Sequence, residues 1–190
     1  MKEPLLIVIA APSGGGKSTV LARIFAEVPG LLFSISHTTR PPRKGEQNGR
    51  EYFFVDEARF KALVSEGAFL EWAEVHGNLY GTAREELNRA RAGGCDLVLD
   101  IDVQGAAQVV RAHPHALTIF LRPPSLQVLK TRLHGRGTDS QEALAVRLKN
   151  ADQELARVSD FRHLVVNDEL DATVRKVREI IETERAGKVR

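Results

Sequence analysis

The stretch Leu5-Leu-Ile-Val-Ile-Ala-Ala-Pro-Ser-Gly-Gly-Gly-Lys-Ser-Thr19 decides the fold of this chain. Its first seven residues form a continuous apolar run, which is typical of a parallel strand that is covered on both faces. Three glycines, Lys17 and Ser18 follow this run and open a segment of helical character. A strand, a glycine-rich turn and a helix in this order are the context that a phosphate-binding loop requires.

The physical reading of this loop predicts a site for a nucleoside triphosphate with Mg²⁺. Glycines let backbone N–H groups converge on a polyanion, and the start of the helix adds partial positive charge. Lys17 places an ammonium on the β- and γ-phosphates, and Ser18 offers its hydroxyl to Mg²⁺. The general pattern has glycine where Ala11 stands, and we expect this change to be tolerated. The expected triphosphate-binding residues are Ala11, Pro12, Ser13, Gly14, Gly15, Gly16, Lys17, Ser18 and Thr19.

Apolar runs and helical segments alternate along most of the remaining chain. Further runs lie at 97–100, 118–121 and 164–167, and helical segments follow them at 103–112, 125–133 and 170–184. This alternation predicts an α/β fold with a parallel sheet, covered by helices on both faces. Asp100 closes one of the strands, as a carboxylate that serves Mg²⁺ often does. Another apolar stripe, Leu144, Leu148, Ala151 and Leu155, predicts a long helix over 141–157.

Residues 33–82 have a different pattern and predict an inserted lobe of mixed strands and a short helix. Short strands are expected at Ile35, 52–55 and 69–75, and Asp56 is expected to cap a helix. The expected division is a core of residues 1–32, 83–134 and 158–190, a lobe of residues 33–82, and a lid of residues 135–157.

Composition and charge exclude several classes of protein. The 190 residues carry a net charge of +2, which argues against a nucleic-acid coat and an acidic tail. A single cysteine excludes an intramolecular disulfide framework and fits a reducing, cytoplasmic location. No apolar run approaches the roughly 18–20 residues of a membrane span. We therefore expect no nucleic-acid or membrane partner, and the oligomeric state stays open.

Two groups of residues of anion-binding types accompany the phosphate loop. The first lies within 34–55 and includes Arg40, Arg43 and Tyr52; the second is Arg132, Arg136 and Arg147, with Gly135 and Gly137 as hinge positions. Arginine suits forked contacts to phosphate, and such cations stabilise a transferring phosphoryl group. Either group alone could equally be a solvated surface. Together with the loop they favour a phosphotransferase with two anionic substrates over a hydrolase or a switch.

Two acidic residues fit the recognition of guanine. A carboxylate such as Glu71 or Asp102 can accept hydrogen bonds from the N1–H and the amino group of guanine, whereas adenine presents an acceptor at N1. Taken alone, either acid is more readily explained as a surface charge.

Motifs along nearly the whole chain resemble the guanylate kinase family. They are Pro12-Ser-Gly-Gly-Gly-Lys-Ser-Thr19, Ser34-Ile-Ser-His-Thr-Thr-Arg-Pro-Pro-Arg43, Phe69-Leu-Glu-Trp-Ala73, Leu99-Asp-Ile-Asp-Val-Gln-Gly105 and Arg132-Leu-His-Gly-Arg-Gly137. The resemblance implies transfer of the γ-phosphate of ATP to GMP, and also to dGMP. It implies a parallel-sheet core, an inserted GMP-binding lobe and an arginine-bearing lid.

The resemblance also implies residue roles. The GMP phosphate would be held by Ser36, Arg40, Arg43, Tyr52 and Tyr80. The guanine would be read by Glu71, Thr82 and Asp102. Magnesium would be organised by Ser18 and Asp100, and Asn167 would lie beside the adenine of ATP. Catalysis would rest on Lys17, Arg40, Arg132, Arg136 and Arg147.

Three alternatives stay open at this point. One is an inactive guanylate kinase-like module that binds peptides, which tends to lose residues that are present here, such as Lys17 and Glu71. Another is a kinase for AMP or a pyrimidine nucleotide, which Glu71 and Asp102 argue against. The last is a triphosphate-hydrolysing switch.

Overall fold

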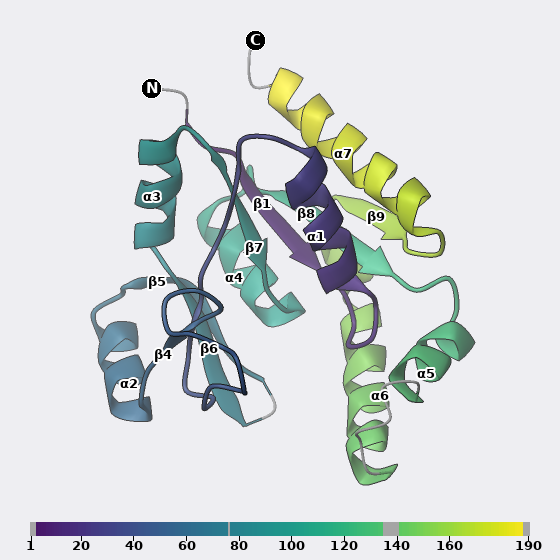
Figure 1. Cartoon of the computed structure of the whole chain (residues 1–190), viewed down its shortest axis with the longest axis horizontal. Helices are drawn as coiled ribbons and strands as arrows, with labels where there is room; N and C mark the ends of the chain where they lie inside the picture. Colours follow the sequence, from purple (N-terminus) through teal and green to yellow (C-terminus); the bar gives the residue numbers. More distant parts are fainter. Residues whose placement is uncertain (1–2, 76, 135–140, 188–190) are drawn as a thin grey trace. The chain divides into compact units, whose positions relative to one another are not determined.

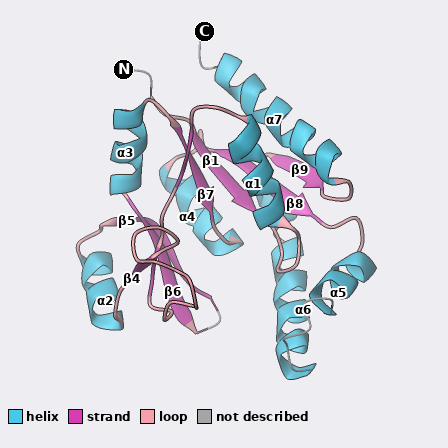
Figure 2. Ribbon diagram, in the orientation of Figure 1, coloured by secondary structure: helices cyan, strands magenta, loops and turns pink. Residues whose placement is uncertain are grey.

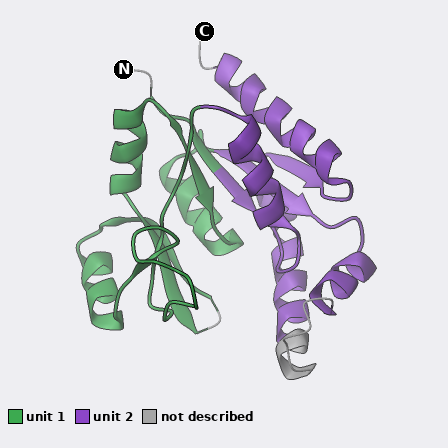
Figure 3. Cartoon of the chain, in the orientation of Figure 1, with its two compact units in different colours: residues 1–7, 30–116 green, residues 8–29, 117–190 purple. Residues whose placement is uncertain are grey.

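The computed structural model describes residues 3–75, 77–134 and 141–187, with the side chains of 141–145 left aside (Figure 1). The chain forms two compact units. Residues 1–7 and 30–116 make unit 1, and residues 8–29 and 117–190 make unit 2 (Figure 3). The predicted division into core, lobe and lid follows other boundaries and stays a prediction.

The main sheet has five strands in the order β2-β7-β1-β8-β9. They are β1 (Leu6–Ala10), β2 (Leu31–Phe33), β7 (Asp96–Asp100), β8 (Leu117–Arg122) and β9 (His163–Val166). β2 pairs in parallel with β7, and β8 pairs in parallel with β9. Every residue of β1 is buried, as the continuous apolar run predicts. The predicted α/β fold with a parallel sheet is confirmed.

Unit 1 also contains a second, four-stranded sheet in the order β4-β3-β6-β5. The strands of this sheet are β3 (His37–Thr38), β4 (Phe53–Phe54), β5 (Phe69–Val75) and β6 (Asn78–Ala83). Unit 1 also contains the helices α2 (Glu57–Ser65), α3 (Glu85–Gly93) and α4 (Val103–Ala112). Asp56 accepts a hydrogen bond from the Arg59 N–H and so caps α2, as predicted. Phe60, Leu63 and Phe69 form the small core of this sheet and helix.

The strand expected at Ile35 is wrong, because residues 34–36 lie between β2 and β3. Strands β2, β3 and β6 and helix α3 were not predicted. Gly81 interrupts the alternation of β6, and a Cβ there would lie 3.0 Å from the Phe69 ring and 3.1 Å from the Phe60 ring. The strand therefore needs glycine where a strand pattern favours a larger residue. Helix α3 buries Glu86 and Ala90, so it has no apolar stripe for a periodicity argument to find.

The described residues of unit 2 form the α-helices α1 (Lys17–Glu27), α5 (Leu126–His134), α6 (Gln141–Leu155) and α7 (Leu170–Gly187), and a short 3-10 helix, η1 (Val158–Asp160). Helices α1 and α7 pack against each other, and α7 packs on β8 and β9 (Figure 2). Ala151, with Leu148 and Leu155 beside it, packs on Leu129 and Leu133, so this part of the predicted apolar stripe is confirmed. The side chain of Leu144 lies outside the described residues. No helix in the described part of the chain is long and apolar enough to cross a membrane.

Candidate active site

The phosphate loop joins β1 to α1 and depends on its glycines. Gly14 and Gly16 have φ angles of 79° and 82°, in the left-handed region that side chains disfavour. A Cβ on Gly15 would lie 2.8 Å from the Pro12 carbonyl oxygen. That oxygen accepts a hydrogen bond of 2.7 Å from the Gly15 N–H, which closes the turn. Ala11 is 7% exposed, and the left-handed torsions of the loop fall on Gly14 and Gly16.

The start of α1 has the properties of an anion site. Gly16 occupies the N-cap position, where no side chain hydrogen-bonds to the helix, and the first turn contains no acidic residue. The first N–H groups of a helix have no partners within the helix and carry partial positive charge. Ser18 and Thr19 lie exposed on this first turn. The arrangement therefore suits the binding of phosphate groups.

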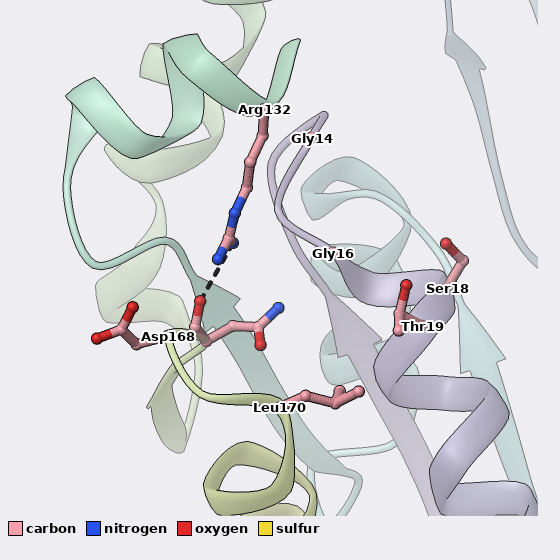
Figure 4. Close-up of a pocket in the computed structure, with 8 residues that line it drawn as sticks. Gly14, Gly16, Ser18, Thr19, Arg132, Asp168 and Leu170 are labelled. Carbon is pink, nitrogen blue, oxygen red and sulfur yellow. Dashed lines mark hydrogen bonds between the residues drawn. The ribbon is translucent and has the colours of Figure 1, made fainter. Parts of the chain in front are cut away.

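A hollow of about 290 Å³ opens beside this helix start (Figure 4). Asn167, which follows β9, is 5% exposed and donates from its Nδ2 to the Gly15 carbonyl oxygen at 2.7 Å. The Arg132 Nη1 donates to the Asn167 carbonyl oxygen at 3.1 Å. A Cβ on Gly16 would come within 2.5 Å of the Asn167 amide nitrogen. The hollow is lined by Gly14, Gly16, Ser18, Thr19, Arg132, Asn167, Asp168 and Leu170.

The structure brings Arg132, one of the three arginines of the second predicted group, to this hollow. Arg132 lies in the last turn of α5 and reaches the loop through Asn167. Arg147 is placed on α6, and Arg136 lies outside the described residues. A residue that sequence reasoning missed also contacts the loop from α6, because the Ser13 N–H donates to the Glu154 carboxylate at 3.3 Å.

In unit 1 a carboxylate organises the arginine that was predicted to hold the GMP phosphate. The Arg40 Nη2 donates to both oxygens of Glu46, at 2.8 and 2.9 Å, and these bonds raise the pKa of Arg40. Glu46 also accepts from the Arg43 N–H at 2.7 Å. The Arg40 guanidinium lies 5.4 Å from the centre of the Tyr52 ring, and Tyr80 packs edge-on against Tyr52. Sequence reasoning missed Glu46, whose signal is an acidic residue that follows the two arginines and precedes Tyr52.

A second cluster links Ser36, Thr82 and Glu71. The hydroxyls of Ser36 and Thr82 lie 3.2 Å apart, and the Thr82 N–H donates to the Glu71 Oε1 at 3.0 Å. Thr82 is fully buried and Glu71 is 4% exposed. Burial raises the pKa of Glu71 to about 7; the hydrogen bonds from Thr82 oppose this rise, and the charge of Asp102 adds to it. Unit 1 therefore contains a carboxyl poised to titrate near neutrality.

Asp102 occupies a helix cap rather than a strand. Strand β7 ends at Asp100, so Asp102 lies beyond the strand. Asp102 is the N-cap of α4, and its Oδ1 accepts from the Gly105 N–H at 2.9 Å. Asp100 stays half-buried at the strand end, and its charge is a secondary cause, after burial, of the raised pKa of Tyr52.

A parallel sheet whose strand β1 leads through a glycine loop into α1 defines a P-loop nucleotide-binding protein. The guanylate kinase family model matches residues 3–184. Similar proteins include the guanylate kinases of Nitrosomonas europaea, 46% identical over 97% of this chain and 92% of that protein, and of Neisseria meningitidis serogroup A, 49% identical over 93% and 86%. A solved guanylate kinase from Anaplasma phagocytophilum is similar with a TM-score of 0.77 and 31% identity, over 97% of this chain and 87% of that one.

The chain belongs to the guanylate kinase family. The predicted activity, transfer of phosphate from ATP to GMP, is confirmed at the level of this family. Nothing in these comparisons favours the alternative of an inactive peptide-binding module.

Proposed function

We propose that ATP and GMP occupy the two clusters described above, with ATP at the phosphate loop of unit 2 and GMP at the Arg40 and Glu71 clusters of unit 1. The observation that carries this proposal is the buried Glu71 carboxylate, whose Oε1 is bonded to the Thr82 N–H. A buried carboxylate is costly unless it has partners. Guanine offers two adjacent donors, so its binding would satisfy the carboxylate, whereas adenine would not.

At the GMP site we assign a phosphate end and a base end. The phosphate end consists of arginine side chains and the hydroxyls of serine and tyrosine. The base end consists of two carboxylates and Thr82. Arg40 is preorganised by Glu46, which keeps its forked donors in one place for a phosphate. We assign Ser36, Arg40, Arg43, Tyr52 and Tyr80 to the phosphate, and Glu71, Thr82 and Asp102 to the guanine.

At the ATP site the glycine loop and the start of α1 would hold the phosphates, with Lys17 on the transferring group. The contacts of Asn167 support a role in holding the loop and Arg132. Its predicted place beside the adenine stays a prediction. We assign the dispersal of charge during transfer to Lys17, Arg40, Arg132, Arg136 and Arg147. We also propose that residues 33–82 form the GMP-binding lobe and residues 135–157 the lid, which would exclude water from the reacting phosphate.

The donors available for magnesium fit that ion. The Ser18 hydroxyl and the Asp100 carboxylate are hard oxygen donors, which Mg²⁺ prefers, and it commonly takes its remaining ligands from phosphate and water. Within the described ranges no three His, Cys, Asp or Glu side chains gather into a metal cluster. We therefore propose that Ser18 and Asp100 hold Mg²⁺ together with ATP, directly or through water. When bound, the ion neutralises charge on the phosphate oxygens.

The test is a coupled assay of ATP with GMP, dGMP, AMP, CMP, UMP and dTMP, run on the wild type and on Glu71→Gln. We expect GMP and dGMP to lead clearly in the wild type. The Glu71→Gln variant keeps the shape of the side chain but offers an N–H₂ group where guanine needs an acceptor. Its KM for GMP should rise at least tenfold, while its KM for ATP stays within twofold. Equal losses for both substrates would show that the guanine assignment is wrong.

A further inference from the structure

Strand β5, which carries Glu71, has one neighbouring strand among those that the structure describes. It lies at one end of the four-stranded sheet, where β6 is its partner, and α4 packs against it. The pairing is irregular between Phe69 and Glu71, so that Glu71 faces Thr82 after a bulge. An edge strand with a bulge is less constrained than a central strand. The position of the Glu71 carboxylate therefore depends on what holds the free side of β5.

Gln108 of α4 binds the main chain of β5 immediately beyond Glu71. The Trp72 N–H donates to the Gln108 Oε1 at 3.2 Å, and the Gln108 Nε2 donates to the Trp72 carbonyl oxygen at 2.6 Å. The side-chain amide thus occupies both main-chain groups of one residue, as a neighbouring strand would.

Gly105 lies one turn earlier on α4 and contacts Glu71 itself. A Cβ on Gly105 would overlap the Glu71 Oε2 and lie 3.0 Å from the carboxyl carbon. Asp102 lies three residues before Gly105, and Gln108 lies three residues after it, so these residues share one face of α4. This face meets the carboxylate at Gly105 and the following peptide at Gln108.

We propose that Gln108 is a positioning residue for guanine recognition: it fixes the main chain of Trp72 and thereby sets where the Glu71 carboxylate lies, in the space that Gly105 leaves open. This inference rests on the proposed function, in which Glu71 reads the guanine. Thr82 holds the Glu71 Oε1 from β6, and α4 fixes the strand from its other side. A carboxylate must match two donors at once, so a displacement of about 1 Å weakens recognition strongly.

The test replaces Gln108 by Met, which has a similar length but makes neither hydrogen bond. The ligands are GMP and IMP, which lacks the amino group of guanine, and binding is measured by calorimetry. We expect the Kd of GMP to rise about tenfold, the Kd of IMP to rise less than threefold, and the KM for ATP to stay within twofold. The matched control is Gln127→Met on the exposed surface of α5, which should change none of these values. A purely structural role would weaken both ligands alike and leave the GMP-to-IMP ratio unchanged.

A second variant keeps the inference testable if Gln108→Met folds poorly. Gly105→Ala adds a methyl group against the Glu71 carboxylate, although alanine ordinarily stabilises a helix interior. We expect the same selective loss of GMP binding. Its control is Gly93→Ala in α3, where the added Cβ would make only an ordinary contact of 3.7 Å with Cys95.

Glu71→Gln, measured alongside, separates this inference from the proposed function. In the Glu71→Gln background, Gln108→Met should raise the Kd of GMP by less than twofold, because the two residues act as a unit. If Glu71→Gln itself preserves the GMP-to-IMP ratio, the guanine role of Glu71 fails and the inference fails with it. A different outcome is that Glu71→Gln abolishes the preference for GMP over IMP, while Gln108→Met and Gly105→Ala keep the GMP-to-IMP ratio of Kd values within twofold. In that case Glu71 retains its role and the positioning role of Gln108 is overturned. Additive effects in the double variant would overturn it as well.

Discussion

At the scale of a single residue, burial raises the pKa of Glu71 to about 7. We therefore expect guanine binding to depend on pH. Only the ionised carboxylate accepts both hydrogen bonds from guanine. The Kd of GMP should therefore fall about tenfold between pH 6 and pH 8, as the ionised fraction rises through a pKa near 7. Calorimetric titration across this range measures the effect.

The phosphate of GMP also titrates in this range, so a control variant is needed. Glu71→Gln keeps the phosphate contribution and removes that of the carboxyl. The difference between the two pH profiles isolates Glu71. If both proteins show the same profile, the carboxyl is not the group that controls guanine binding.

The same pKa predicts how the stability of the ligand-free protein changes with pH. The folded state holds the proton of Glu71 up to about pH 7, whereas the unfolded state releases it near the ordinary value of 4.5. The free energy of unfolding should therefore decrease as pH rises from 4.5 to 7, by up to about 3 kcal/mol. Chemical denaturation at pH 5 and pH 8 measures this difference. Glu71→Gln should flatten the dependence, and an equally steep dependence in that variant would contradict the assignment.

Several site residues could be predicted from the sequence because their side-chain chemistry suits nucleotide binding. The contacts between residues that are distant in the sequence could not be predicted. Glu71 was predicted from its chemistry, and the structure places its carboxylate on Thr82. Glu46, Glu154 and Gln108 were missed because their partners are main-chain or arginine groups with no periodic relation to them. Polar side chains of this kind look like ordinary surface residues until the fold brings their partners to them.

At the scale of elements, the side chain of Asn167, which follows β9, binds the phosphate loop. The Asn167 amide is buried and donates to the Gly15 carbonyl oxygen, so its loss leaves a buried acceptor without a partner. Asn167→Ala should lower the free energy of unfolding by about 1–3 kcal/mol. It should also raise the KM for ATP severalfold, with the KM for GMP unchanged, because the loop would no longer be held. Thermal unfolding and steady-state kinetics measure these effects.

Asn167→Asp is the matched control, since it keeps the shape and removes the donor. An ionised carboxylate would repel the Gly15 carbonyl oxygen, so we expect a loss at least as large as in the alanine variant. Wild-type behaviour of Asn167→Asp would show that the hydrogen bond does not hold the loop.

Elements with strong apolar patterns were predictable, and elements shaped by their neighbours were not. The apolar run of β1 and the apolar stripe of α6 are visible in the sequence, because burial selects apolar residues at fixed spacing. Strand β6 contains Gly81 because the rings of Phe60 and Phe69 occupy the space of a side chain. The N-cap role of Asp102 was not predicted, because an aspartate fits an N-cap and the end of a strand equally well.

At the scale of the whole molecule, we expect GMP binding and phosphate transfer to be separable, because the proposed GMP-binding residues lie in unit 1 and the phosphate loop lies in unit 2. Lys17 lies in the phosphate loop of unit 2, and the proposed GMP residues lie in unit 1. Lys17→Ala should therefore reduce kcat by about a thousandfold or more, since its charge acts on the transferring phosphate. Its Kd for GMP, measured by calorimetry without ATP, should stay within twofold of the wild-type value. Lys176→Ala on the exposed face of α7 removes a lysine of equal charge and should change neither quantity. A parallel loss of GMP binding in Lys17→Ala would mean that the two sites are not independent, and wild-type turnover would remove Lys17 from the chemistry altogether.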